Sequence, residues 1–147
     1  AFYDCFKKRM GVSSQPVYDF ELADLIQKCQ GLEELSIPFA KEEIDNVIKI
    51  IPTNRAPGPD NIPAEFYMHC WDFVKSDIMR LFKAFHSNNL DIARLNYGVI
   101  TLTPKMKGAK KIQQYRPICL LRCPYKLITK VLDNRVALFA DKLISKH

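Results

Sequence analysis

The chain has 147 residues, of which 48% are hydrophobic and 26% are charged, and its formal net charge is +6 at pH 7. This length suits one domain with a buried core, and the composition is typical of a globular protein. No run approaches the roughly 20 apolar residues that span a bilayer, so the sequence predicts no transmembrane helix and no membrane partner.

The basic residues are concentrated in the last third of the chain. Residues 1–93 hold 10 Lys and Arg against 14 Asp and Glu, whereas residues 94–147 hold 12 against 2. No acidic side chain lies between Asp91 and Asp133. Such a one-sided field suits a polyanionic partner, because phosphate neutralisation dominates the affinity of proteins for nucleic acid. Taken alone, the charge pattern fits a solvated basic face equally well.

The first half of the sequence predicts helices joined by one rigid loop. Apolar residues recur at helical spacing over residues 20–29, and Gly31 is a plausible C-terminal cap. The same spacing recurs over residues 44–51, where Pro52 ends the helix. Residues 52–61 contain three prolines and a glycine, which predicts a loop.

An aromatic-rich run follows the loop, and Pro63 suits the first position of its helix. The run predicts one or two helices that end near Asn88, with their aromatic side chains in the core. Its apolar members are Phe66, Tyr67, Trp71, Phe73, Ile78, Leu81, Phe82 and Phe85.

The second half predicts a β-hairpin with a basic loop, followed by a helix. Residues 97–103 alternate and are rich in β-branched side chains, which favours a strand. Residues 115–121 form the returning strand, with Pro117 at an edge or a bulge. Helical spacing returns from Tyr125 to Ile144. The predicted fold class is therefore α+β, mostly helical with one antiparallel hairpin.

Five cysteines stand at positions 5, 29, 70, 119 and 123. An odd number without regular spacing indicates buried, reduced thiols in an intracellular protein, nuclear or cytoplasmic, and no targeting segment is evident. Zinc is the alternative, because Cys119 and Cys123 would face one way on a helix and His69 adjoins Cys70. A second Cys/His pair at finger-like spacing is missing.

Three segments carry a family pattern. Residues 55–67 read Arg-Ala-Pro-Gly-Pro-Asp-Asn and then Pro-Ala-Glu-Phe-Tyr, residues 95–105 contain Leu-Asn and Ile-Thr-Leu-Thr-Pro-Lys, and residues 115–135 begin Tyr-Arg-Pro-Ile-Cys-Leu. In this order they resemble motifs 0, 1 and 2 of the reverse transcriptase of plant-type LINE (non-LTR) retrotransposons. The resemblance covers residues 36–147, a partial reverse transcriptase domain, and residues 1–35 form a helical lead-in with little family signal.

The resemblance implies the fingers and the beginning of the palm of an RNA-directed DNA polymerase. The intact enzyme would use an RNA template, a DNA primer, deoxynucleoside triphosphates and Mg²⁺. The resemblance assigns Lys105 and Arg116 to the triphosphate, one as a point charge and the other as a planar fork. It also implies a group of template or nucleic-acid-binding residues: Arg55, Pro57, Gly58, Lys107, Lys110 and Lys111.

Other roles stay open for these residues. The Pro-Gly-Pro loop is also explained as a rigid connector, in which Gly58 allows close approach of a backbone or a ligand. Any one lysine of the basic loop is also explained as a solvated side chain.

The metal-binding aspartates of the family are missing. Residues 139–142, Phe-Ala-Asp-Lys, match the Phe/Tyr-Ala-Asp-Asp turn at three positions, but Lys142 would repel a divalent cation, and we interpret Asp141 as a surface residue. We therefore expect no catalytic residue, no bound metal and no activity from this chain alone, which would need the remainder of the polymerase. Two further hypotheses are a non-catalytic nucleic-acid-binding module and a helical interaction domain.

Overall fold

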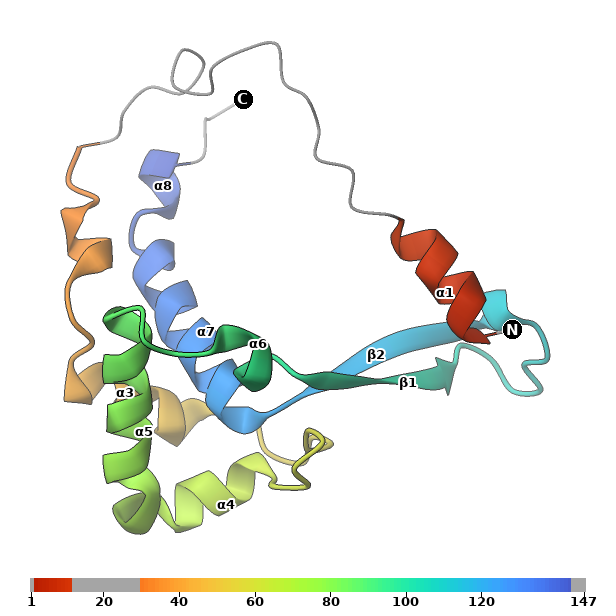
Figure 1. Ribbon diagram of the computed structural model, residues 1–147, viewed down its shortest axis with the longest axis horizontal. Coiled ribbons are helices and arrows are strands. Elements are labelled where there is room, and N and C mark those ends of the chain that lie inside the picture. Colours follow the sequence, from red (N-terminus) through yellow and green to blue (C-terminus); the bar gives the residue numbers. More distant parts are fainter. Residues whose placement is uncertain (1, 12–29, 144–147) are drawn as a thin grey trace.

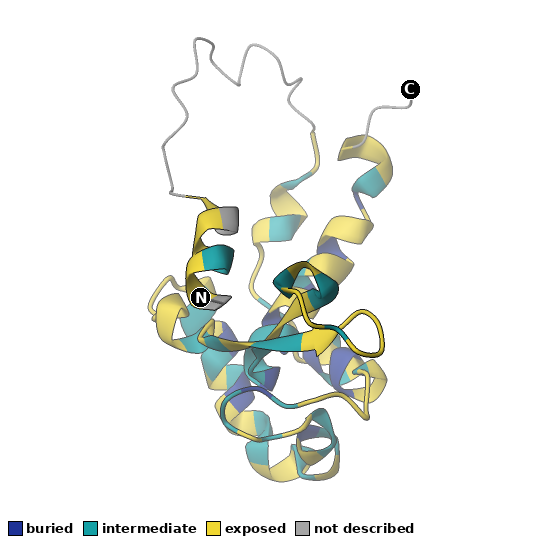
Figure 2. Cartoon of the chain, turned by 90° about the vertical axis from the view of Figure 1, so that its right-hand side faces the viewer, coloured by how far each residue is buried: buried dark blue, intermediate teal, exposed yellow. Residues whose placement is uncertain are grey.

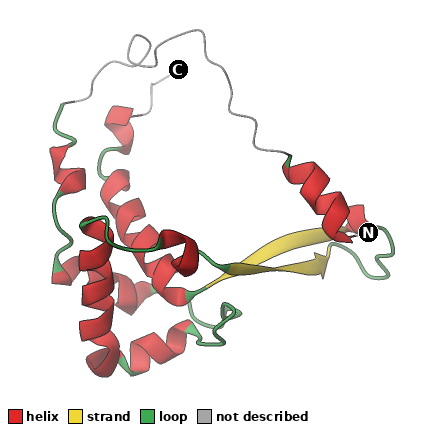
Figure 3. Cartoon of the chain, in the orientation of Figure 1, coloured by secondary structure: helices red, strands yellow, loops and turns green. Residues whose placement is uncertain are grey.

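The computed structural model describes residues 2–11 and 30–143, which form helices and a two-stranded antiparallel sheet (Figures 1 and 3). In chain order the elements are α1 (Phe2–Met10), the 3-10 helix η1 (Glu33–Ser36), α3 (Lys41–Ile50), α4 (Ala64–His69), α5 (Trp71–His86), α6 (Ile92–Leu95), β1 (Gly98–Pro104), the 3-10 helix η2 (Ile112–Gln114), β2 (Tyr115–Leu121), α7 (Cys123–Ala137) and α8 (Ala140–Leu143). The predicted α+β class is confirmed. The helix expected over residues 20–29 lies outside the described residues. None of the helices within 2–11 and 30–143 has the length and apolar character needed to cross a membrane.

The core is formed by side chains of α3, α4, α5 and the first half of α7, and Figure 2 shows the buried residues in dark blue. The predicted inward spacing of α3 is confirmed at Ile44, Val47 and Ile48, which are at most 4% exposed. Among residues 2–11 and 30–143, the buried members of this core cluster are Ile44, Val47, Ile48, Tyr67, Ile78, Phe82, Cys123, Leu127, Ile128 and Val131. Because α7 follows β2 after a single residue, the helix that fills the core also anchors the hairpin.

The aromatic run of α4 and α5 lies only partly in this core. Tyr67 and Phe82 are buried, but 86% of Phe73 and 41% of Phe66 are exposed, so the prediction was wrong for these two residues. Phe73 shares the outer face of α5 with Asp77, one turn further along. The run is therefore not a single inward stripe.

Prolines stand at the starts of two helices whose boundaries differ from the prediction. Pro63 is the N-cap of α4 and not its first helical residue. Pro124 lies in the first turn of α7, which begins at Cys123, two residues before the predicted start. A first-turn proline suits a helix because its missing N–H would have no helical partner there.

A buried arginine joins α7 to the segment before α3. Arg135 is 7% exposed, and its Nε and Nη2 atoms donate to the two carboxylate oxygens of Glu43, each at 2.7 Å. Its terminal nitrogens also donate to three backbone carbonyls, those of Leu35 at 3.3 Å, Ile37 at 2.7 Å and Pro38 at 3.0 Å. The planar fork thus satisfies the carboxylate and an irregular piece of backbone together.

The Glu43 carboxylate is held ionised by this arrangement. The Arg135 hydrogen bonds hold the pKa of Glu43 below its ordinary value. The same carboxylate accepts the Ala40 backbone N–H at 2.7 Å and so caps the start of α3. Because this pKa is lower in the folded state, its contribution to stability is present above the ordinary carboxyl pKa and is lost as the pH falls through the folded-state pKa.

Gly58 fixes the rigid loop against the junction of β2 and α7. It is buried, and a Cβ at this position would lie 2.6 Å from the Arg122 backbone nitrogen and 2.7 Å from the Leu121 carbonyl carbon. The expected close approach to Gly58 is therefore confirmed for a backbone. Asn61 takes φ 57°, the left-handed conformation that asparagine tolerates, and its N–H donates to Gly58 O at 3.0 Å.

Replacing Arg135 by Lys tests the buried fork. An ammonium group cannot reproduce the paired donation to Glu43, so we expect the free energy of unfolding in urea to fall by about 3 kcal/mol. The matched control is Arg80→Lys, because Arg80 pairs with Asp77 on the exposed surface of α5. That change should stay within about 0.5 kcal/mol. Equal losses in the two variants would contradict a special role for Arg135.

Replacing Gly58 by Ala tests the docking of the loop. The added methyl group meets backbone atoms that cannot rotate away, so we expect a loss of about 1–3 kcal/mol in the free energy of unfolding. Thr53→Ala, at an exposed position of the same loop, should change this free energy by less than about 0.5 kcal/mol. A Gly58→Ala variant as stable as the parent chain would show that the loop is not held there.

Candidate nucleic-acid interface

The hairpin projects from the helical body as an extended arm (Figure 1). Its ladder runs without interruption from the Gly98–Leu121 pair to the Pro104–Tyr115 pair. Hydrophobic side chains on it are largely open to solvent, with Ile100 at 48% and Ile118 at 43% exposure. The predicted strands are therefore confirmed, but they contribute little to the buried core.

Lys105 and Arg116 are diagonal neighbours across this ladder. Arg116 pairs with Thr103, and the Lys105 backbone N–H continues the ladder by donating to Gln114 O at 2.7 Å. Strand alternation puts Thr103 and Arg116 on one face, Lys105 directly follows the last residue of β1, and both cations are exposed. The Lys105 ammonium donates to Gln113 O at 2.9 Å. Lys105 and Arg116 therefore lie near one another in the hairpin, as expected, and their shared surface and triphosphate role stay predictions.

The three other lysines of the basic loop lie beyond the end of the strands. Lys107, Lys110 and Lys111 are all exposed. They project at the far end of the hairpin, away from the Pro-Gly-Pro loop at its base (Figure 1). The predicted nucleic-acid-binding residues thus fall into two groups, one at the tip and one at the base of the arm.

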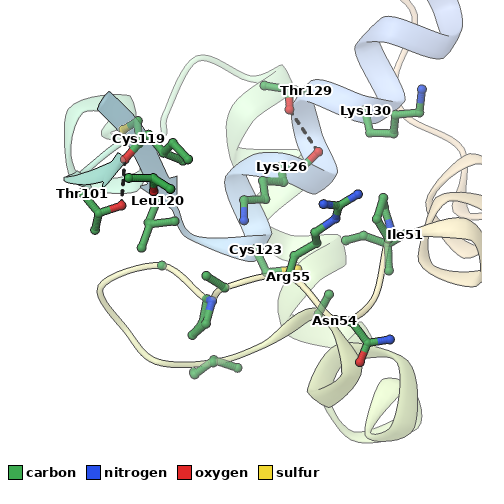
Figure 4. Close-up of a pocket in the computed structure, with 18 of the residues that line it drawn as sticks. Ile51, Asn54, Arg55, Thr101, Cys119, Leu120, Cys123, Lys126, Thr129 and Lys130 are labelled. Atoms are coloured by element: carbon green, nitrogen blue, oxygen red, sulfur yellow. Dashed lines mark hydrogen bonds between the residues drawn. The ribbon is translucent and has the colours of Figure 1, made fainter. Parts of the chain in front are cut away.

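The group at the base lines an open cleft of about 890 Å³ between the loop, the hairpin and α7 (Figure 4). Arg55, Pro57 and Gly58 form one wall. Thr101, Thr103, Ile118 and Leu120 of the hairpin contribute to another wall, and the first turns of α7 close the cleft. Its lining combines apolar side chains, hydroxyl groups and cations, which suits a ligand with both apolar and anionic parts.

Two of the cations in this cleft were not predicted. Lys126 and Lys130 of α7 line the cleft, and Figure 4 shows them on the side toward which Arg55 extends from the loop. Lys130 also donates to Asp133 at 2.7 Å. The pattern that would have found them is the i, i+4 spacing of two lysines on the solvent-facing side of a helix whose other side is apolar.

The cysteines do not form the helical pair that the zinc alternative needs. Cys119 is exposed on β2, where a buried thiol was expected, and Cys123 is buried at the start of α7. Burial raises the pKa of Cys123 to about 11, so its thiol stays protonated near neutral pH. Among residues 2–11 and 30–143, no group of three or more His, Cys, Asp or Glu side chains is arranged to hold a metal ion.

The chain is similar to a known transposon protein. No protein-family model matches the chain. Over 105 residues the chain is 30% identical to the Transposon TX1 uncharacterized 149 kDa protein of Xenopus laevis. The match covers 71% of this chain but only 8% of that protein, so the chain spans less than a tenth of the relative's length. This similarity supports a transposon origin for the chain, in agreement with the retrotransposon family that its motifs resemble.

Proposed function

We propose that the chain is the fingers, with the beginning of the palm, of a LINE-type (non-LTR) retrotransposon reverse transcriptase close to the plant type. The observation that carries the proposal is the way the three motif segments meet. Gly58 of the first segment packs on the backbone at Leu121 and Arg122, where the hairpin built from the other two segments continues into α7. The chain's similarity to a transposon protein supports the same assignment.

In this proposal the hairpin contacts the phosphates of the incoming nucleotide. Arg116 offers a planar fork and Lys105 a compact charge, and the two exposed residues lie close together in the hairpin register. Mg²⁺ and the carboxylates that hold it would belong to the palm of the longer polymerase, where they align the attacking and leaving oxygens. The remaining basic residues would contact the template and primer backbones, mostly without sequence preference.

The 147-residue chain would therefore bind nucleic acid without adding nucleotides to a primer. The proposed division assigns residues 36–147 to the polymerase and residues 1–35 to a lead-in. Arg135 holds the carbonyls of Leu35 and Ile37, on both sides of that boundary. The second candidate is a nucleic-acid-binding module derived from the polymerase, which the exposed cations of the hairpin also support.

Salt dependence tests the binding part of the proposal. We expect weak binding to single-stranded RNA at low salt, with log K falling linearly with log salt by about 0.7 per phosphate neutralised. Lys111→Ala should make this slope shallower by about that amount. Lys83→Ala removes the same charge from the exposed surface of α5 and should leave the slope unchanged. Fluorescence anisotropy of labelled RNA measures the binding constant of each variant at each salt concentration. Binding that does not change with salt would contradict phosphate contacts.

Primer extension tests the polymerase part. In a longer protein that includes the palm, Arg116→Ala should lower kcat/KM for a deoxynucleoside triphosphate roughly 10- to 100-fold, because charge-assisted hydrogen bonds to phosphate are lost. Lys111→Ala should lower it much less. The 147-residue chain alone should incorporate no nucleotide with Mg²⁺. Equal effects of the two substitutions would remove the special role of the fork, and incorporation by the short chain would contradict the proposed division.

A further inference from the structure

The loop at the tip of the hairpin is organised around one uncharged residue, Gln114. Through its backbone, Gln114 accepts the Lys105 N–H at 2.7 Å and donates to Lys111 O at 2.9 Å. Through its side chain, the Oε1 atom accepts the backbone N–H groups of Lys110 and Lys111, both at 2.8 Å. Its Nε2 atom lies 3.4 Å from the Met106 sulfur, as a donor. One glutamine therefore touches both ends of the basic loop.

Other contacts complete the loop. The Tyr115 hydroxyl donates to Ala109 O at 2.9 Å, and Gly108 turns the chain with φ 76°. The Lys105 ammonium donates to Gln113 O. These bonds hold a segment of four lysines in one conformation although it lies outside the buried core. Three of the lysines, at positions 105, 110 and 111, have their backbone N–H groups bonded to Gln114.

We propose that Gln114 is a positioning residue for nucleic-acid binding, which fixes the backbone of the lysine loop so that its charges are presented together. This role rests on the proposed function of the chain as a nucleic-acid-binding part of a polymerase. A flexible loop loses conformational entropy when it binds, whereas a loop already held in shape loses less. The residue contributes no charge of its own, so its effect is separable from that of the lysines.

The effect of Gln114 and the effect of the lysines can be told apart by the salt dependence of binding. The slope of log K against log salt depends on the number of phosphates that are neutralised. The value of log K at any one salt concentration depends also on the entropy that the loop loses on binding. Replacing Gln114 should therefore lower log K by the same amount at every salt concentration and leave the slope unchanged. Replacing a lysine should change the slope.

The experiment uses the whole 147-residue chain, single-stranded RNA and three variants. Gln114→Ala should bind about three- to tenfold more weakly at every salt concentration, with the slope of the parent chain. Gln113→Ala is the matched control, because this neighbour is exposed and accepts the Lys105 ammonium through its backbone carbonyl, which the substitution keeps. It should bind as the parent chain does. Unfolding in urea should show that all variants are folded, because none of these changes touches the core.

Hydrogen exchange measured by NMR provides the second measurement. The Lys110 and Lys111 amide protons should exchange faster in Gln114→Ala than in the parent chain, since both lose their acceptor. Gln114→Glu retains an acceptor of the same length, so it should restore the protection of these two amides. Loss of protection in Gln113→Ala as well would contradict the assignment to Gln114.

The outcomes distinguish this inference from the proposed function. If the parent chain binds RNA and Gln114→Ala binds equally well, or binds with a changed slope, the positioning role is wrong and the proposed function stands. If the parent chain does not bind RNA at low salt, the proposed function fails and the positioning role fails with it. A lower log K for Gln114→Ala with the slope of the parent chain, and unchanged binding by Gln113→Ala, support both the proposed function and the positioning role.

Discussion

The pairing of Arg135 with Glu43 connects the part of the chain before α3 to the helix that organises everything after the hairpin. A guanidinium at 7% exposure is tolerated because Glu43 and three backbone carbonyls accept its N–H groups, and the Phe39 ring lies 4.4 Å below it. The pair also fixes α7, whose first turns line the cleft and whose start receives Gly58. The position of the loop, the cleft and the hairpin base therefore depends on how this pair holds α7.

The hairpin follows a different physical principle. It buries few side chains, and its form comes from its own ladder and from the hydrogen bonds of its tip. Several lysines can lie close together on the hairpin because solvent screens the repulsion between their charges and no buried acidic partner is needed. The molecule thus combines a packed body, which fixes the cleft, with an exposed arm, which carries many of the cations.

Local sequence patterns predicted α3, α5, the two strands and most of α7, but they missed α1 and α6 and said little about long-range contacts. The spacing of Ile44, Val47 and Ile48 and the alternation of β1 depend on neighbouring residues, and the structure has both as expected. The partner of Arg135 lies 92 residues away, and no local pattern contains that information. Phe73 was misplaced because hydrophobicity alone does not say which face of a helix meets the core. Lys105 and Arg116 are close together in the hairpin, as expected, because hairpin register follows from strand positions, whereas Lys126 and Lys130 line the cleft through tertiary packing.

The separation of Glu43 and Arg135 along the chain also bears on the order of folding. The helices that precede the hairpin cannot complete their core until α7 is available, because α7 supplies Leu127, Ile128 and Val131 to it. Closing so long a loop carries an entropic cost that grows only slowly with length, but contacts of this kind form late and slow the folding reaction. During synthesis, α3 and α5 would therefore expose their apolar faces until the end of α7 has been made, and would be most open to aggregation in that interval.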